Sequence, residues 1–200
     1  LGDVYKRQGY GDLGCYGHPK AKTPIIDRLA KEGVRFTQHY SNGTECSPTR
    51  TALLTGRYPQ WAGGLECAIG TGNVGRYDDA ILLADRRQLG LPAEQVVLPG
   101  ELKKAGYVTG IFGKWHLGYE PRFNPIEHGW DEFFGYLGGN VHYFNHRETS
   151  DLHVLFRGRL PVHSEGYMTH LITGSSTDFI ARNKNKPFFL FVSHESPHFP

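Results

Sequence analysis

The sequence has little of what marks several common protein classes. Its three cysteines leave at least one thiol unpaired, which argues against a disulfide framework. No apolar run approaches the roughly 18 residues of a membrane-spanning helix. Positive charge is barely in excess, with 22 Lys and Arg against 20 Asp and Glu, so no nucleic-acid partner is expected. The sequence has 200 residues, of which 38% are hydrophobic, and this is enough to form one globular core.

Segments typical of helices alternate along the chain with segments typical of strands. Helices are expected between Thr23 and Gly33 and over residues 47–55, 80–89, 98–105 and 164–183, and strands over 34–40, 107–112 and 187–193. Residues 119–163 are expected to be aromatic-rich and glycine-rich loop with short strands at most. This order predicts an α/β fold with a mostly parallel central sheet flanked by helices. Ligands of such sheets bind beyond the carboxyl ends of the strands.

The segment from Cys46 to Arg57 holds the sharpest chemical motif, Cys-Ser-Pro-Thr-Arg followed by Thr-Gly-Arg. Pro48 suits the first turn of a helix, so Cys46 is expected at a helix N-terminus, where free N–H groups favour an anion. Arg50 lies one turn further on the same face. Together they predict an anion site. For this segment alone, a buried structural cysteine beside a solvated Arg50 is the alternative.

Two more segments that follow expected strands carry reactive side chains. Lys114 and His116 are two residues apart, so on an extended chain leaving the strand 107–112 both point to one side. His198 follows the strand 187–193. A surface lysine, a loop histidine and a histidine that caps a strand end are the structural alternatives. Reactive side chains at several strand exits nevertheless favour one common site.

Together these segments resemble the sulfatase family, the alkaline-phosphatase-like enzymes that hydrolyse sulfate esters. Beside the Cys46 motif, the segments that resemble the family in its own order are Gly9–Gly17, Thr23–Ala30, Gly113–Gly118 and Pro197–His198. The resemblance implies an alkaline-phosphatase-like fold, with residues 9–200 as the N-terminal part of a sulfatase catalytic domain. It also implies an arylsulfatase-type sulfuric ester hydrolase.

The resemblance further implies how the reaction runs. A dedicated maturation enzyme would oxidise Cys46 to formylglycine, a hydrated aldehyde of which one hydroxyl attacks sulfur and the other allows sulfate to leave. A divalent cation, Ca²⁺ or Mg²⁺, and Arg50 would stabilise the nucleophile. The modified Cys46 would itself be a ligand of that metal.

The remaining site residues are also implied by the resemblance. Lys114 would bind the sulfate oxygens and the diol, and His116 would contact the diol and act as the base of the elimination step. His198 would bind sulfate and assist the leaving oxygen. Asn140 lies in a loop that often approaches the sulfate in this family, although a Gly-Gly-Asn turn is an adequate structural explanation.

The sequence departs from the family pattern near its start. Where the family has two adjacent aspartates that bind the metal, this chain has Lys6 and Arg7. Two cations cannot coordinate Ca²⁺ or Mg²⁺, which take carboxylate oxygens. Either the protein is a metal-free relative, or residues 1–8 are a non-native segment, which we expect because they show no strand or helix pattern.

Other functions share these features. A phosphate or phosphonate monoester hydrolase of the same fold is the nearest, because tetrahedral oxyanions fit one pocket. A non-catalytic relative that binds sulfated glycans is another, and Lys6 and Arg7 are its only support. We expect a sulfated small molecule or glycan as substrate and, from the resemblance, a periplasmic or secreted protein. We also expect the chain to be incomplete at both ends and inactive by itself.

Overall fold

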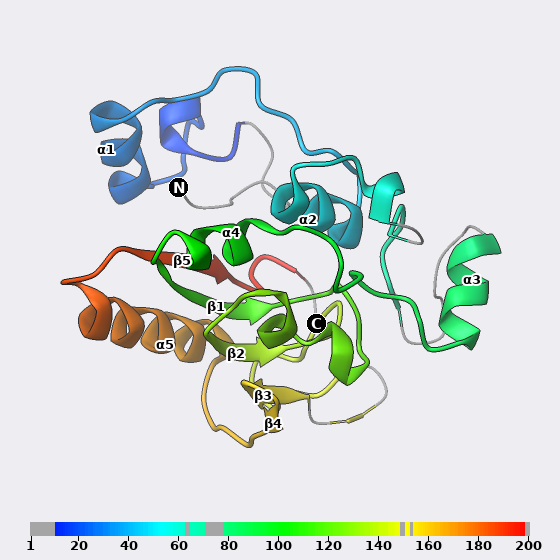
Figure 1. Ribbon diagram of the computed structural model, residues 1–200. Helices are drawn as coiled ribbons and strands as arrows, with labels where there is room; N and C mark the ends of the chain where they lie inside the picture. The colour runs from blue at the N-terminus through cyan, green and yellow to red at the C-terminus, as the bar shows by residue number, and fades with distance from the viewer. Residues whose placement is uncertain (1–10, 63–64, 71–77, 149–150, 153, 199–200) are drawn as a thin grey trace. The chain divides into compact units, whose positions relative to one another are not determined.

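The computed structural model describes residues 11–62, 65–70, 78–148, 151–152 and 154–198 (Figure 1). The chain divides into two compact units, Leu1–Ser41 and Asn42–Pro200. The expected non-native segment 1–8, with Lys6 and Arg7, lies outside the described residues. The assignment of residues 9–200 to one catalytic domain stays a prediction.

The first unit contains a short 3-10 helix, η1 (Gly14–Tyr16), and the helix α1 (Pro24–Glu32), which begins and ends as predicted. Pro24 occupies the first turn, where its missing N–H costs no hydrogen bond. The Thr23 hydroxyl accepts a hydrogen bond from the Gly14 amide at 2.9 Å and donates one to Asp27 Oδ1 at 2.9 Å. Thr23 therefore ties the start of α1 to η1.

The predicted strand over residues 34–40 is wrong. The backbone there is irregular, and both Val34 and Phe36 are exposed. Among residues 11–41 of this unit, no strand lies alongside to complete a ladder. An alternating pattern forms a strand only where a neighbouring strand supplies the backbone hydrogen bonds.

The second unit is built on a five-stranded sheet of order β4-β3-β2-β1-β5. The strands are β1 (Val108–Lys114), β2 (Glu132–Tyr136), β3 (Leu155–Arg157), β4 (Leu160–Pro161) and β5 (Phe188–Ser193). β1 pairs in parallel with both β2 and β5, whereas β3 and β4 add antiparallel pairs at one edge. The α/β prediction is confirmed, and the sheet is mixed, with its parallel strands side by side.

Helices flank this sheet on both sides. They are α2 (Cys46–Thr55), α3 (Asp78–Asp85), α4 (Leu98–Lys104) and α5 (Met168–Asn183), with the 3-10 helices η2 (Pro59–Ala62), η3 (Pro121–Phe123) and η4 (Pro125–His128). The four α-helices overlap the four predicted ones. In the part of the chain that the structure describes, no helix is both long and apolar enough to cross a membrane.

Alternate residues of the central strands enter two separate cores. Ile111 of β1 and Phe133 of β2 belong to one hydrophobic cluster, and the next residue of each strand belongs to the other. Successive strand side chains point to opposite faces, so each face needs its own cover. α5 covers one face through Phe179, and α4 lies on the opposite side of the sheet (Figure 1).

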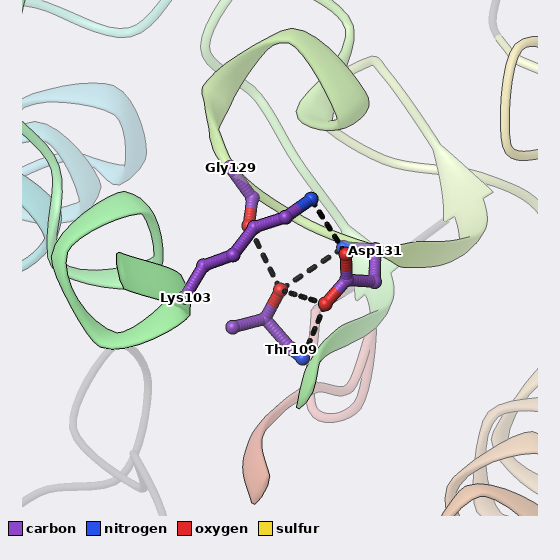
Figure 2. A network of polar contacts seen from close by, with 4 residues as sticks. All are labelled: Lys103, Thr109, Gly129 and Asp131. Carbon is purple, nitrogen blue, oxygen red and sulfur yellow. Dashed lines mark hydrogen bonds and ion pairs between the residues drawn. The ribbon is translucent and has the colours of Figure 1, made fainter. Parts of the chain in front are cut away.

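A polar network fixes the amino-terminal end of β1 (Figure 2). Asp131, just before β2, accepts hydrogen bonds from the Thr109 amide at 2.9 Å and from the Thr109 hydroxyl at 3.1 Å, and pairs with Lys103 of α4 at 2.6 Å. The Thr109 hydroxyl also reaches the Gly129 carbonyl at 2.8 Å. This network fixes the amino-terminal end of β1 and does not involve the carboxyl ends of the parallel strands, where ligands are expected to bind.

Candidate active site

Cys46 is the first residue of α2, as the sequence predicted, and its side chain is partly buried. Lys114, the last residue of β1, donates a hydrogen bond from Nζ to Cys46 Sγ at 3.2 Å. Each of the three cysteines lies among the described residues and is a free thiol. A helix N-terminus and an ammonium group thus converge on one sulfur atom, and both favour negative charge there.

Arg50 holds α2 against the end of β1. Its side chain is only 4% exposed, and Nη1 donates to the Lys114 carbonyl at 2.7 Å. This burial is incompatible with the alternative of a solvated arginine on a helix face. A buried guanidinium fixed one turn from Cys46 is positioned to stabilise an anion at that residue.

Lys114 lies in a strongly polar, dehydrated setting. It is 3% exposed, and Nζ also donates to the Gly139 carbonyl. Burial and the Arg50 charge lower the pKa of Lys114 to about 8, although the nearby charges of Cys46 and Glu195 act to raise it. At neutral pH the ammonium form still predominates, so Lys114 can pair with an anion.

The backbone conformation at His116 differs from the extended one that the sequence predicted. The chain is not extended there, because His116 has φ +58°, in the left-handed region that residues other than glycine seldom adopt. Its ring hydrogen-bonds the Ile69 carbonyl through Nε2 and lies against Gly139, where an added Cβ would be 2.8 Å from Cε1. Lys114 and His116 therefore both adjoin Gly139.

Ser47 is a site residue that the sequence reasoning missed. Its buried hydroxyl donates to the His116 carbonyl at 2.9 Å and accepts from the Ile69 amide at 3.1 Å. Ser47 thus joins α2 to the unusual turn at His116. Its place directly after Cys46 was the signal available in the sequence.

His198 connects to this group through Glu195. His198 Nδ1 lies 3.6 Å from Glu195 Oε1, and the His198 amide donates to the Glu195 carbonyl at 2.9 Å. Glu195 is almost fully buried and acts on the Lys114 charge. Sequence reasoning named the segment after β5 but not this carboxylate, whose signal was its position just beyond the strand.

Asn140 directly follows Gly139, the residue whose carbonyl binds Lys114, and is partly buried. Gly138 is packed tightly from behind, since an added Cβ would lie 2.0 Å from Glu148 Oε1 and 3.1 Å from the Tyr119 hydroxyl. Burial raises the pKa of Glu148 and of Tyr119. Close packing at Gly138 and the hydrogen bond to the Gly139 carbonyl thus fix the turn that leads into Asn140.

The described residues contain no group of ligands for the expected metal. Among the residues that the structure describes, no three His, Cys, Asp or Glu side chains are grouped so that they could hold a metal ion. Ca²⁺ and Mg²⁺ need several oxygen ligands, and Glu195 is a single carboxylate beside cationic groups. The described residues therefore do not form a Ca²⁺ or Mg²⁺ site.

Comparisons with known proteins agree on one family. The sequence model of the sulfatase family matches residues 4–200. Human N-acetylgalactosamine-6-sulfatase is 36% identical over 206 residues, which cover 96% of this chain and 38% of the relative. The chain thus spans less than two-fifths of that relative's length.

Solved structures give the same result. The crystal structure of Ps i-CgsB superposes with a TM-score of 0.80 at 31% identity, covering 96% of this chain and 43% of that one. The structure of BT4656 in complex with its substrate D-glucosamine-2-N,6-O-disulfate superposes with a TM-score of 0.68 at 27% identity, covering 94% of this chain and 32% of that one. With an alkaline-phosphatase-like fold and these relatives, the chain belongs to the sulfatase family.

Proposed function

We propose that the protein of which this chain is a part hydrolyses sulfate esters with a nucleophile made from Cys46. The observation that carries the proposal is the hydrogen bond from the buried Lys114 ammonium to Cys46 at the N-terminus of α2. A sulfate monoester is an anion and its hydrolysis releases the sulfate dianion, so a site that hydrolyses it must concentrate positive charge around the nucleophile. Membership of the sulfatase family supports the same reaction.

The nucleophile requires that Cys46 be converted to formylglycine by a maturation enzyme. When hydrated, that aldehyde supplies two hydroxyl groups on one carbon, one to attack sulfur and one to let sulfate leave. Cys46 is not in a disulfide, and its side chain is only partly buried in the folded chain, so such an enzyme can reach it before or during folding. The residue and its helix position fit this role.

Lys114 and Arg50 bind and orient the sulfate group. The Lys114 ammonium donates to sulfate oxygens, and Arg50 holds the Lys114 backbone so that Nζ stays beside position 46. Because Lys114 is dehydrated, its attraction for an anion is stronger than that of a surface lysine. This pair therefore supplies positive charge that offsets the negative charge of the substrate's sulfate group.

The histidines move protons. The His116 ring lies next to Gly139, which also binds Lys114, so it is within the same small group and serves as the base that allows sulfate to leave. His198, beside Glu195, binds sulfate and protonates the leaving oxygen. Asn140 donates its amide to a sulfate oxygen from the turn at Gly139.

The substrate is proposed to be a sulfated sugar or a sulfated aromatic compound. A phosphate monoester has the same tetrahedral shape, so the rival activity of a phosphate ester hydrolase is tested in parallel. Turnover of 4-nitrophenyl sulfate by the modified full-length protein should exceed turnover of 4-nitrophenyl phosphate. The reverse preference would assign the site to phosphate esters.

The experiment combines peptide mass analysis with a matched pair of lysine variants. After co-expression with the maturation enzyme, the peptide that contains Cys46 should carry formylglycine. Lys114→Ala should lower kcat/KM for 4-nitrophenyl sulfate by about a hundredfold or more, whereas Lys104→Ala on the exposed face of α4 should not change it. An unmodified Cys46 in active protein would refute the proposal.

A further inference from the structure

A cluster of aromatic side chains lies at the surface of the second unit, and we name Tyr143, Phe144 and Tyr167 the aromatic platform. The rings of Phe144 and Tyr167 are stacked, with centroids 5.2 Å apart and an interplanar angle of 30°. Tyr143 packs on Tyr167 at 5.5 Å. Phe144 nevertheless remains 66% exposed. The platform therefore presents an exposed apolar ring, that of Phe144, which is held in place by Tyr167.

The platform is attached to the segment that carries His198. The Tyr143 hydroxyl donates to the His198 carbonyl at 2.5 Å. On the other side, Thr169, two residues after Tyr167, is hydrogen-bonded to Ser196 at 3.3 Å. Since His198, a residue of the candidate active site, lies in this same segment beside Glu195, the aromatic platform adjoins that site.

Polar side chains border the aromatic platform. The His142 ring lies 6.3 Å from that of Phe144, and the His170 ring meets Tyr167 edge-on at 5.2 Å. Both histidines are exposed and can donate or accept hydrogen bonds. The surface thus combines an open aromatic face with hydrogen-bonding groups at its margin.

This combination matches the chemistry of a sugar. One face of a pyranose ring presents C–H groups that pack on an aromatic ring, while the hydroxyls around its edge need hydrogen-bond partners. A sulfated aryl or other ring without hydroxyls is bound best in an enclosed apolar pocket. An open platform bordered by histidines favours the sugar.

We propose that the aromatic platform is a binding subsite for the sugar ring of a saccharide sulfate whose sulfate group occupies the site at Cys46. The inference rests on the proposed function, because it takes the Cys46 site as the sulfate-binding end of the same substrate. It adds the class of the alcohol that carries the sulfate. Phe144 is then a residue that determines substrate specificity.

The test measures binding directly, so that it does not depend on turnover. Full-length protein with Cys46→Ala, which has no nucleophile, is titrated by calorimetry with galactose-6-sulfate and, separately, with inorganic sulfate. Adding Phe144→Ala should weaken binding of galactose-6-sulfate by about tenfold and leave the affinity for inorganic sulfate unchanged. Phe144→Tyr, which keeps the ring, should restore the affinity for the sugar sulfate.

Tyr58→Ala is the matched control, because Tyr58 is also 66% exposed but belongs to the segment after α2. It should alter neither affinity. Equal affinities for galactose-6-sulfate with and without Phe144→Ala would overturn the inference, and so would equal weakening of both ligands. A Cys46→Ala protein that binds neither ligand would contradict the proposed function itself, a result distinct from the loss of sugar recognition alone.

Discussion

Replacing Arg50 by alanine tests how the site is held together. The Arg50 guanidinium donates to the Lys114 carbonyl at 2.7 Å in a buried setting. A hydrogen bond from a charged group contributes about 1.5–3 kcal/mol, and its loss also leaves a buried carbonyl without this donor. We therefore expect Arg50→Ala to lower the free energy of unfolding by about 3 kcal/mol. Urea unfolding followed by tryptophan fluorescence measures the change.

The same substitution should affect the reaction more than the fold. Without Arg50, the backbone of Lys114 is no longer fixed beside position 46, and one positive charge is lost. Turnover of an aryl sulfate should fall by at least about a hundredfold in protein that is still folded. Arg182→Ala is the control, since Arg182 pairs with Glu132 at the surface and should cost less than about 1 kcal/mol. Unchanged stability and turnover in Arg50→Ala would refute the reasoning.

Two further predictions concern stability. Burial lowers the pKa of His128 to about 4, so the unfolded chain takes up a proton between pH 6.5 and 4 that the folded chain does not. The stabilisation that comes from the neutral, buried His128 is fully present above pH 6.5 and should fall by about 3 kcal/mol on acidification to pH 4. His128→Leu should remove this part of the pH dependence of the unfolding free energy, measured by urea titrations at several pH values. An unaltered pH dependence would contradict the prediction. Gly113→Ala should cost about 3 kcal/mol or more, because φ is +112° and the new Cβ would lie 1.9 Å from the Ser193 carbonyl oxygen. Gly174→Ala, which meets nothing within 4 Å on α5, should be neutral or slightly stabilising, and equal effects of the two glycine variants would contradict the packing argument.

Much of the fold could be predicted where local sequence signals agree with packing. α2 begins at Cys46 and ends at Thr55, and the next residue, Gly56, has φ +68° and suits a helix C-terminus. The continuous apolar run of β5 is typical of a parallel strand covered on both faces. Such elements can be predicted from the local pattern alone, without knowing which strand or helix packs against them. Among the described residues, 34–40 have no partner strand, and there the local pattern gave a wrong prediction.

The central strand β2 lies within residues 119–163, which were expected to be aromatic-rich and glycine-rich loop with short strands at most, and it contains Gly135. That glycine is required by close approach of the strands, since a Cβ at Gly135 would lie 1.9 Å from the Gly113 carbonyl oxygen. Its meaning depends on β1, a strand distant in sequence. A glycine that reads locally as a turn residue is thus a consequence of tertiary packing.

The candidate site divides in the same way. Cys46, Arg50, Lys114 and His116 carry motif signals and are brought together by the described contacts. The left-handed backbone of His116 and the buried carboxylate of Glu195 have no local signal, because both depend on how the strand ends meet. Sequence identifies the reacting groups, whereas the contacts that orient them arise only on folding.

The most direct test of the central claim is a crystal structure of the full-length protein soaked with inorganic sulfate. The account predicts one sulfate ion beside residue 46, with an oxygen accepting a hydrogen bond from Lys114 Nζ and the His116 ring next to it. Electron density for sulfate only at other places, with none between residues 46, 114 and 116, would contradict the claim that these side chains surround a single tetrahedral anion.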